Sequence, residues 1–236
     1  MKNSTLALLL CGLAACSQAS EANEEEVAVT VYGEEFIEEG IPSSEMADGW
    51  SVTFDTFLVT VKDVTIADVT LTDFEPIDIA NKTDGMGHTL ATPTVPAGEH
   101  SGSQFTISRV EMAGSASKEG ITKNFAWTFE QETHYTNCQT TTSVGPEERA
   151  TFQITVHADH FFYDSLVAEE PQVVFQALAD ADSDEDGTIT RAELEATGIG
   201  SYDPGNDDTV NDLWTWLEAQ SRTLGHVDGE GHCDAQ

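Results

Sequence analysis

The sequence predicts a mostly β fold: an antiparallel β-sandwich or barrel over residues 27–168, followed by a small helical segment over residues 169–236. Two observations carry this prediction. In the first segment, runs rich in Val, Thr, Phe and Ile alternate with period two and are separated by turn-rich spacers. After Pro171 the apolar residues recur at helical spacing instead. A chain of 236 residues is long enough for one substantial domain with an appendage.

The first 15 residues are typical of an export signal. Lys2 supplies a positive charge, and the apolar run LALLLCGLAA is shorter than the roughly 20 residues that span a bilayer. The tetrapeptide LAAC, ending at Cys16, resembles the lipobox of bacterial lipoproteins. The resemblance implies a signal peptide over residues 1–15, lipidation of Cys16 and a membrane anchor in the bacterial cell envelope. Ser17, where some lipoproteins have aspartate, implies the outer membrane. An ordinary secretory signal with an incidental cysteine is the alternative.

Residues 16–26 are polar, end in three glutamates and predict a flexible acidic tether. The strands that follow are expected where period-two alternation is clearest. They are 27–33, 50–71 (two strands or one bent strand), 103–113, 124–131 and 150–158. Residues 34–49 are predicted to form a loop, with a short helix as the alternative.

The helical segment opens with Pro171, a residue suited to a first helical turn. A second helix is expected over residues 208–224, with Asp208 as its N-cap. Its apolar stripe comprises Val210, Leu213, Trp214, Leu217 and Leu224. Trp214 and Trp216 are predicted to pack in the core, because aromatic side chains dominate core burial.

The charge balance excludes some partners. The chain has 43 acidic and 9 basic residues, a formal net charge of -34. Nucleic acid is excluded, since its affinity for proteins comes largely from basic contacts to phosphate. Docking on anionic headgroups is excluded for the same reason, so the lipid is expected to hold the protein at the membrane.

The cysteines predict one disulfide. Cys11 leaves with the signal and Cys16 takes the lipid, so Cys138 and Cys233 are left as an even pair in an oxidising compartment. A bond between them would fasten the C-terminal tail to the middle of the chain. Two buried free thiols are the alternative.

The stretch DSDEDGTITRAE, residues 182–193, has the order of a calcium loop. Oxygen donors stand at positions 1, 3, 5, 7, 9 and 12, and Gly187 stands at position 6, where the backbone turns sharply. The expected calcium ligands are Asp182, Asp184, Asp186, Thr188, Thr190 and Glu193. Ile189 at position 8 is the apolar anchor of such loops. The stretch closely resembles an EF-hand, and hard oxygen ligands suit Ca²⁺.

EF-hands usually occur in pairs, and this sequence departs from that pattern. The best second candidate, DPGNDDTVNDLW, has Asp208 where the glycine is needed and Trp214 where the glutamate is needed. A single loop on an exported protein predicts a structural calcium site, for which a dissociation constant of about 10⁻⁴ to 10⁻³ M suffices. An acidic patch without bound metal is the alternative.

The histidines suggest a second metal. Two short groups, HADHFFYD and GHVDGEGHCD, contain four of them, and a Cys138–Cys233 bond would bring a fifth into range. With Asp159 and Asp228, they could bind copper or zinc. The candidate ligands are His134, His157, His160, His226 and His232. The alternative is that these histidines are surface residues that hold the C-terminal tail.

The segments FLVTVKDVTI, VPAGEHSG and FAWTF are faintly similar to bacterial periplasmic copper-binding β-sandwich proteins associated with methanobactin. The resemblance is scattered and implies copper binding. Enzyme motifs are mostly missing: SASK has a Ser-x-x-Lys spacing, but the elements that accompany it in serine enzymes are absent from the sequence. The sequence therefore predicts a non-enzymatic, calcium-binding envelope lipoprotein with a structural or binding role and an unidentified protein or ligand partner. A copper- or zinc-binding protein is the second hypothesis and a hydrolase the third.

Overall fold

The structure is a computed structural model that describes residues 23–146 and 149–236. The predicted signal peptide, Cys16 and most of the predicted tether lie outside these residues. Strands take 45% of the described residues and helices 13%, so the fold is mostly β, as predicted. None of the helices within the described residues is long and apolar enough to cross a membrane.

The larger sheet is built on two long antiparallel strands, β2 (Ser51–Ile66) and β8 (Gln104–Lys118). A tight turn after β8 leads to β9 (Ile121–Phe129), which pairs with the other edge of β8. Shorter strands extend this sheet: β3 (Val69–Leu71), β4 (Ile77–Asp78), β10 (Thr133–Thr136), β13 (Thr188–Ile189) and β15 (Asp234–Ala235). The strands predicted over 50–71, 103–113 and 124–131 are therefore present, and the first of these segments divides into β2 and β3.

The smaller sheet contains β14 (Gly225–Val227), β12 (Ala150–Val156), β1 (Glu24–Tyr32) and β5 (His88–Ala91), with β6 (Thr94–Pro96) also paired to β1. A separate pair joins β7 (Gly98–Ser101) to β11 (Thr141–Val144). The expectation of a wholly antiparallel domain is wrong, because β1 and β12 run parallel, and β9 of the larger sheet also pairs parallel with β13. These strands are far apart in the sequence, so no hairpin turn dictates their relative direction.

The end of the predicted tether forms part of a strand instead. Residues 24–26 belong to β1, where Glu24 pairs with Pro96 and Glu26 with Thr94 of β6. Backbone pairing of this kind does not depend on the glutamate side chains, which is why an acidic composition was misleading here.

The helices are α1 (Glu34–Glu38), the 3₁₀ helix η1 (Asp159–Phe162), α2 (Gln176–Ala179), α3 (Arg191–Ala196) and α4 (Leu213–Gln220). The first lies where a loop was predicted. Pro171 does not open a helix, because the chain after it is extended and Val173 bridges to Tyr163. Asp208 is not a cap either: the helix begins later, where Asp212 accepts a hydrogen bond from the Thr215 amide in a capping box.

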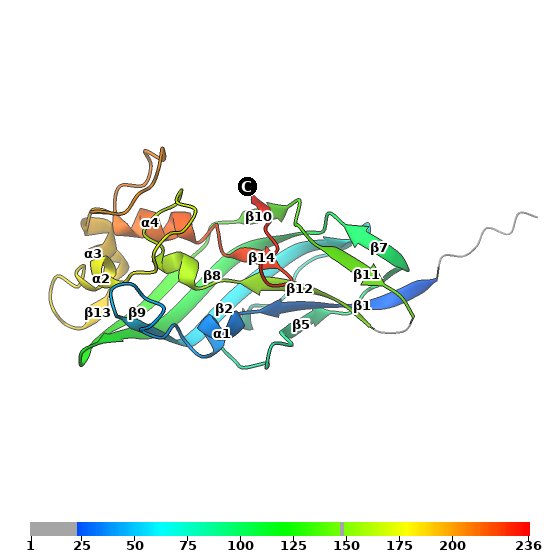
Figure 1. The fold of residues 1–236 in the computed structure, drawn as a ribbon, viewed down its shortest axis with the longest axis horizontal. Coiled ribbons are helices and arrows are strands. Elements are labelled where there is room, and N and C mark those ends of the chain that lie inside the picture. The colour runs from blue at the N-terminus through cyan, green and yellow to red at the C-terminus, as the bar shows by residue number, and fades with distance from the viewer. Residues whose placement is uncertain (1–22, 147–148) are drawn as a thin grey trace, which may run out of the picture.

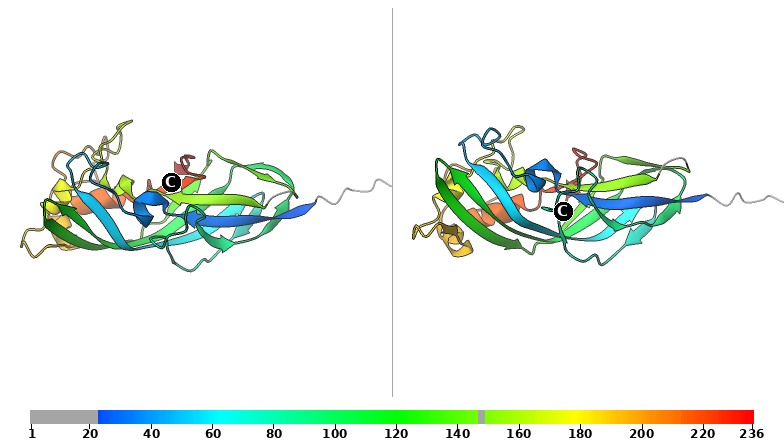
Figure 2. Two further views of the ribbon diagram at one scale, coloured as in Figure 1. Left: turned by 60° about the horizontal axis from the view of Figure 1, so that its bottom comes forward. Right: turned by 90° about the horizontal axis from the view of Figure 1, so that it is seen from below.

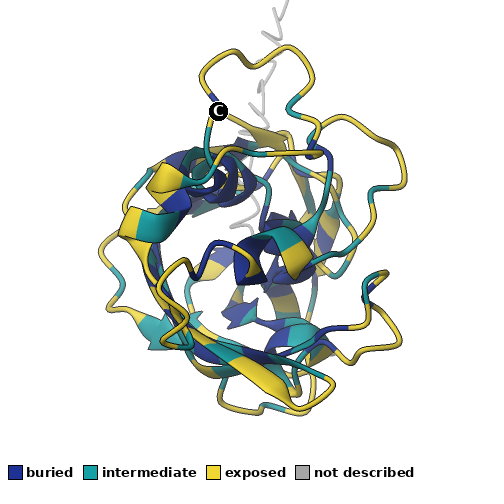
Figure 3. Ribbon diagram, turned by 90° about the vertical axis from the view of Figure 1, so that its left-hand side faces the viewer, coloured by how far each residue is buried: buried dark blue, intermediate teal, exposed yellow. Residues whose placement is uncertain are grey.

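One hydrophobic core connects the two larger sheets and the helices. Phe57 of β2, Phe152 of β12 and Trp216 of α4 are all fully buried in it. Both Trp214 and Trp216 are core residues, as predicted. Figure 3 shows the buried stretches facing inward from strands and helices around this core.

The elongated shape of the molecule separates its parts. The helices α2, α3 and α4 gather at one end of the molecule, with β13 and β9, whereas β7 and β11 lie toward the other (Figures 1 and 2). The C-terminal segment supplies β13, β14 and β15, so it adds strands to both larger sheets.

Candidate metal centres

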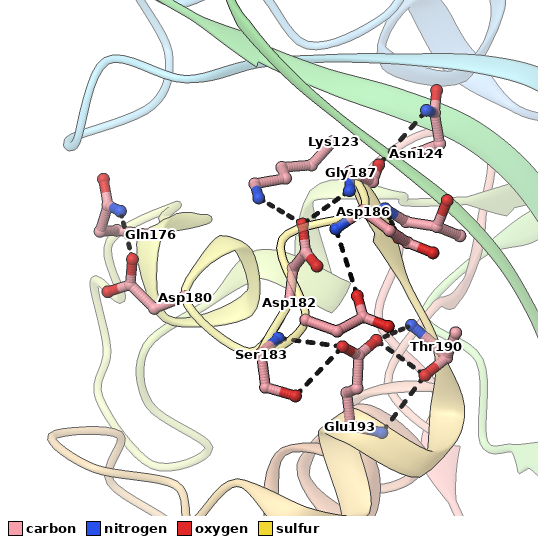
Figure 4. Close-up of polar contacts among 12 residues, drawn as sticks. Lys123, Asn124, Gln176, Asp180, Asp182, Ser183, Asp186, Gly187, Thr190 and Glu193 are labelled. Atoms are coloured by element: carbon pink, nitrogen blue, oxygen red, sulfur yellow. Dashed lines mark hydrogen bonds and ion pairs between the residues drawn. The ribbon is translucent and has the colours of Figure 1, made fainter.

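The predicted calcium loop lies between α2 and α3, and Figure 4 shows the polar contacts that its carboxylates make. Gly187 has φ of 85°, the left-handed backbone that position 6 requires. The carboxylate oxygens of three expected ligands come within 4.8 Å of one another. These residues are Asp182, Asp184 and Glu193.

Asp182, at position 1, uses its two oxygens differently. Its side chain is fully buried. Oδ2 accepts a hydrogen bond from the Gly187 amide at 3.0 Å and from the ammonium of Lys123 on β9. Among the described residues, none donates a hydrogen bond to Oδ1. The Lys123 ammonium, with the Gly187 amide, lowers the pKa of the Asp182 carboxyl, so this group is ionised at neutral pH.

Glu193, at position 12, closes the loop. Oε1 accepts a hydrogen bond from the Ser183 amide at 2.9 Å, and Oε2 accepts from the amide of Thr190 at 2.9 Å. Thr190 is the N-cap of α3 and forms a capping box with Glu193. These hydrogen bonds, first those from Thr190, lower the pKa of the Glu193 carboxyl. The carboxylate that the sequence assigns to calcium therefore ties both ends of the loop together.

Asp184 and Asp186 accept hydrogen bonds from backbone amides within the loop. Asp184 Oδ1 accepts from the Asp186 amide at 3.2 Å, and Asp186 Oδ1 accepts from the Thr188 amide at 2.7 Å. These turns curl the chain around its own carboxylates. The Asp186 carboxylate is not in the group of three, and the Thr190 hydroxyl donates to Glu193 at 2.7 Å.

The larger sheet contacts the loop directly. Strand β13, inside the loop, pairs parallel with Asn124 and Phe125 of β9. The indole of Trp127 donates a hydrogen bond to the Ile189 carbonyl at 3.0 Å, and the Ile189 side chain is buried. The loop is therefore held by backbone pairing to the larger sheet.

The second candidate centre brings four histidines together. The ring centroids of His157 and His226 are 4.3 Å apart, and that of His160 is 5.3 and 5.2 Å from them, respectively. His232 lies 5.0 Å from His226. The ligand atoms form two overlapping groups that could each hold a metal ion: His157 and His160 with Asp159, and His157 and His226 with Glu230. His232 lies beside these groups but belongs to neither.

Strand register explains this convergence. In the antiparallel pair β12–β14, Thr155 lies opposite His226, which places His226 close to His157 just after β12. In the parallel pair β1–β12, Tyr32 lies opposite Thr155, so the chain leaves both strands at the same end. Glu34 thereby reaches the cluster, with Oε2 3.4 Å from His157 Nδ1. Sequence reasoning missed Glu34, because only the parallel pairing brings it near the histidines.

The disulfide holds His232, the fourth histidine, beside the other three. Cys138 and Cys233 are bonded, as predicted. His232 immediately precedes Cys233, and its carbonyl accepts a hydrogen bond from the Gln139 amide at 2.8 Å. The tail is held against β10 on the other side of the disulfide by β15.

A hydrogen bond fixes the orientation of the His160 ring, whereas two other buried atoms of the cluster have no hydrogen-bond partner among the described residues. The Thr223 hydroxyl donates to the Gln220 carbonyl, so it accepts from His160 Nδ1, 3.0 Å away. His160 Nε2 is then the unprotonated nitrogen, with a lone pair available to a metal. Within residues 23–146 and 149–236, the buried atoms His226 Nδ1 and Asp159 Oδ1 have no hydrogen-bond partner. Asp159 Oδ2 accepts from the Tyr163 hydroxyl at 2.7 Å.

Burial keeps two of these imidazoles neutral. Loss of hydration lowers the pKa of His160 to about 4 and that of His226 to about 3, and the neighbouring His157 adds to both shifts. A neutral imidazole is the form that binds metal ions. The cluster therefore suits a metal cation better than protons at neutral pH.

Two residues expected here lie elsewhere. The His134 ring contacts the Thr106 hydroxyl at 2.8 Å and Glu132 at 3.4 Å. It lies on β10, whose backbone pairs with the tail strand, but its side chain is not part of the cluster. Asp228 accepts hydrogen bonds from the Gln153 amide and the Thr140 hydroxyl, so it holds the tail instead of facing the histidines.

A cavity of about 420 Å³ adjoins the four-histidine cluster. His160, His226 and His232 line it, together with Tyr163 and Glu230. His157 is not part of the cavity lining, and Glu34 and the Gly229 carbonyl contact it instead.

Comparison of the chain with models of protein families, with curated proteins and with solved structures gives no significant match.

Proposed function

We propose that this protein binds Ca²⁺ in the loop 182–193 and uses it to hold its helical segment on the β domain. The observation that carries the proposal is Asp182 Oδ1, a buried carboxylate oxygen without a hydrogen-bond donor among the described residues, in a group with carboxylate oxygens of Asp184 and Glu193. Because the Lys123 ammonium and the Gly187 amide both contact Oδ2, Oδ1 is the oxygen of this buried carboxylate that is left for a cation. Its neighbours are the hard oxygen ligands that calcium prefers.

The role of the ion is structural in this proposal. The loop joins α2 to α3 and contacts β9 through β13, so an ion bound in it would fasten helices to the sheet. The scaffold is a sandwich-like packing of the two larger sheets, supported by their shared core. The resemblance of LAAC, ending at Cys16, to a lipobox supports a location at the bacterial envelope, where external calcium would keep a weak site filled.

Removing calcium is expected to lower the melting temperature. Binding to the folded state alone, at about 100 times the dissociation constant, stabilises it by about 2.7 kcal/mol, which corresponds to roughly 5–10 °C for a chain of this size. The measurement is a thermal melt with calcium and with a chelator. Asp182→Asn should abolish the difference between the two melts, whereas Asp208→Asn, an exposed acid outside the loop, should preserve it. Identical melts of the wild type with calcium and with chelator would count against the proposal.

The four-histidine cluster supports a second function, binding of copper or zinc. The observation that favours it is the set of four adjacent imidazoles with two buried atoms, His226 Nδ1 and Asp159 Oδ1, that lack hydrogen-bond partners in the described part of the chain. Imidazole nitrogen is the ligand that copper and zinc share. Glu34, on His157, and Thr223, on His160, would orient these rings from behind, as supporting groups do in known metal sites.

Replacing His226 with alanine is expected to weaken copper binding by at least about 100-fold, because the central ring of the cluster is lost. The matched control is His134→Ala, which removes a histidine outside the cluster and should leave affinity and stoichiometry unchanged. Calorimetric titration with Cu²⁺ and Zn²⁺, followed by elemental analysis, measures both. Equal losses in the two variants would show nonspecific binding to surface histidines instead.

A further inference from the structure

The cavity beside the histidines lies on one side of the cluster only. Three of the four rings line it, whereas His157 is backed by Glu34 and by the Gly229 carbonyl. Its volume of about 420 Å³ is many times the roughly 30 Å³ that one water molecule takes in the liquid. It falls within the range of small-molecule sites, about 300 to 1,000 Å³.

The geometry points to an exchangeable coordination position at this site: a metal held within the histidine cluster, by His157, His226 and Glu230, faces the cavity and binds there a small neutral nitrogen base of the imidazole class. This inference rests on the transition-metal site proposed above and specifies its ligand. Structural metal sites are closed by protein ligands, whereas sites that exchange or transform ligands keep one position accessible. Here protein groups hold the rings on the buried side, and the cavity leaves room on the other.

The cavity lining selects the charge of the ligand. Glu169 and Glu230 line it together with Tyr163, Gln220 and the apolar Leu166 and Pro171. Carboxylates at the opening disfavour small anions, and the protein as a whole has a formal charge of -34. A planar neutral base fits the mixture of ring, apolar and hydroxyl groups, and it donates a lone pair to the metal without adding charge.

The test uses the full-length protein loaded with Cu²⁺ and titrated with imidazole. The visible absorption band of the copper should shift to a saturated value while the copper content of the protein stays constant. Azide, an anion that also binds copper, should require at least about tenfold more ligand for half-saturation. Ala168, an exposed residue that lines the cavity, provides a blocking variant: Ala168→Trp should keep copper stoichiometry and weaken imidazole binding at least about tenfold. Ala97→Trp, at an exposed position on another part of the chain, is the matched control.

The outcomes separate this inference from the proposed function. A wild-type protein that takes up no copper contradicts the metal site itself. Copper uptake without a saturable imidazole shift overturns only the inference, because the site is then closed. Loss of copper during the titration also overturns it, since imidazole would be competing with the protein. Equal binding by Ala168→Trp and Ala97→Trp would place the ligand outside the cavity, and azide binding as tight as imidazole would overturn the selection by charge.

Discussion

Replacing both Cys138 and Cys233 with alanine is expected to lower the free energy of unfolding by about 4 to 5 kcal/mol, since the disulfide spans a sequence separation of 95 residues. A cross-link over so long a loop restricts the unfolded chain, and its removal restores that entropy. The same variant should bind copper more weakly, because His232 directly precedes Cys233 and loses its covalent support. Urea denaturation followed by tryptophan fluorescence measures the first effect, and a copper titration measures the second.

Reduction provides the control for this experiment. A reducing agent should lower the urea midpoint of the wild type toward that of the double variant and leave the variant unchanged. Equal midpoints of the oxidised wild type and the variant would contradict the expected stabilisation. A copper affinity that is the same in both proteins would show that the hydrogen bond from Gln139 and the tail strand β15 suffice to hold His232.

Replacing Trp127 with alanine is expected to lower the free energy of unfolding by about 3 to 5 kcal/mol, the usual cost of truncating a buried aromatic side chain. Trp127 is 2% exposed, stacks on Phe125 at 4.6 Å and donates its indole hydrogen to the Ile189 carbonyl. Because Ile189 belongs to the calcium loop, the variant should also bind calcium more weakly. Chemical denaturation and a calcium titration under folding conditions measure these effects.

Two matched variants separate packing from docking of the loop. Phe57→Ala removes another fully buried ring, which packs against Phe54 and Phe161, and should cost a similar amount of stability without weakening calcium binding. Trp127→Phe keeps an aromatic ring in the core but loses the hydrogen bond, at a cost of about 1 kcal/mol. If Phe57→Ala lowered calcium affinity as much as Trp127→Ala, general destabilisation would explain the loss, and the sheet would have no specific role at the loop.

The predicted calcium loop is the part of the candidate sites whose local geometry the sequence indicated best. Twelve consecutive residues contain its carboxylates, its left-handed glycine and its helix cap, so local hydrogen bonds suffice to bring Asp182, Asp184 and Glu193 together. The strands at 103–113 and 124–131 were predictable for a similar reason, since alternation along one segment reports its burial. The partner of the loop was not predictable. Nothing near Ile189 in the sequence shows that β9 pairs with it.

Helix boundaries show where local signals were insufficient. Proline and aspartate often stand at the start of a helix, yet Pro171 and Asp208 both lie outside the helices of the structure. In the structure, Val173 bridges to Tyr163 and keeps the chain extended, and Asp212 caps the later start of α4. Long-range pairing in the first case, and a competing cap in the second, outweighed a modest local preference.

The amino-acid sequence by itself was enough to predict a β-rich fold, and it contains one calcium-type loop, one pair of cysteines after Cys16 and two histidine groups. Only the tertiary structure decided which histidines meet. The parallel pairing of β1 with β12 and the antiparallel pairing of β12 with β14 brought Glu34, His157 and His226 to one place, and the same fold left His134 beside Glu132. Strand direction and register are set by the packing of the whole sheet, and no short stretch of sequence contains that information.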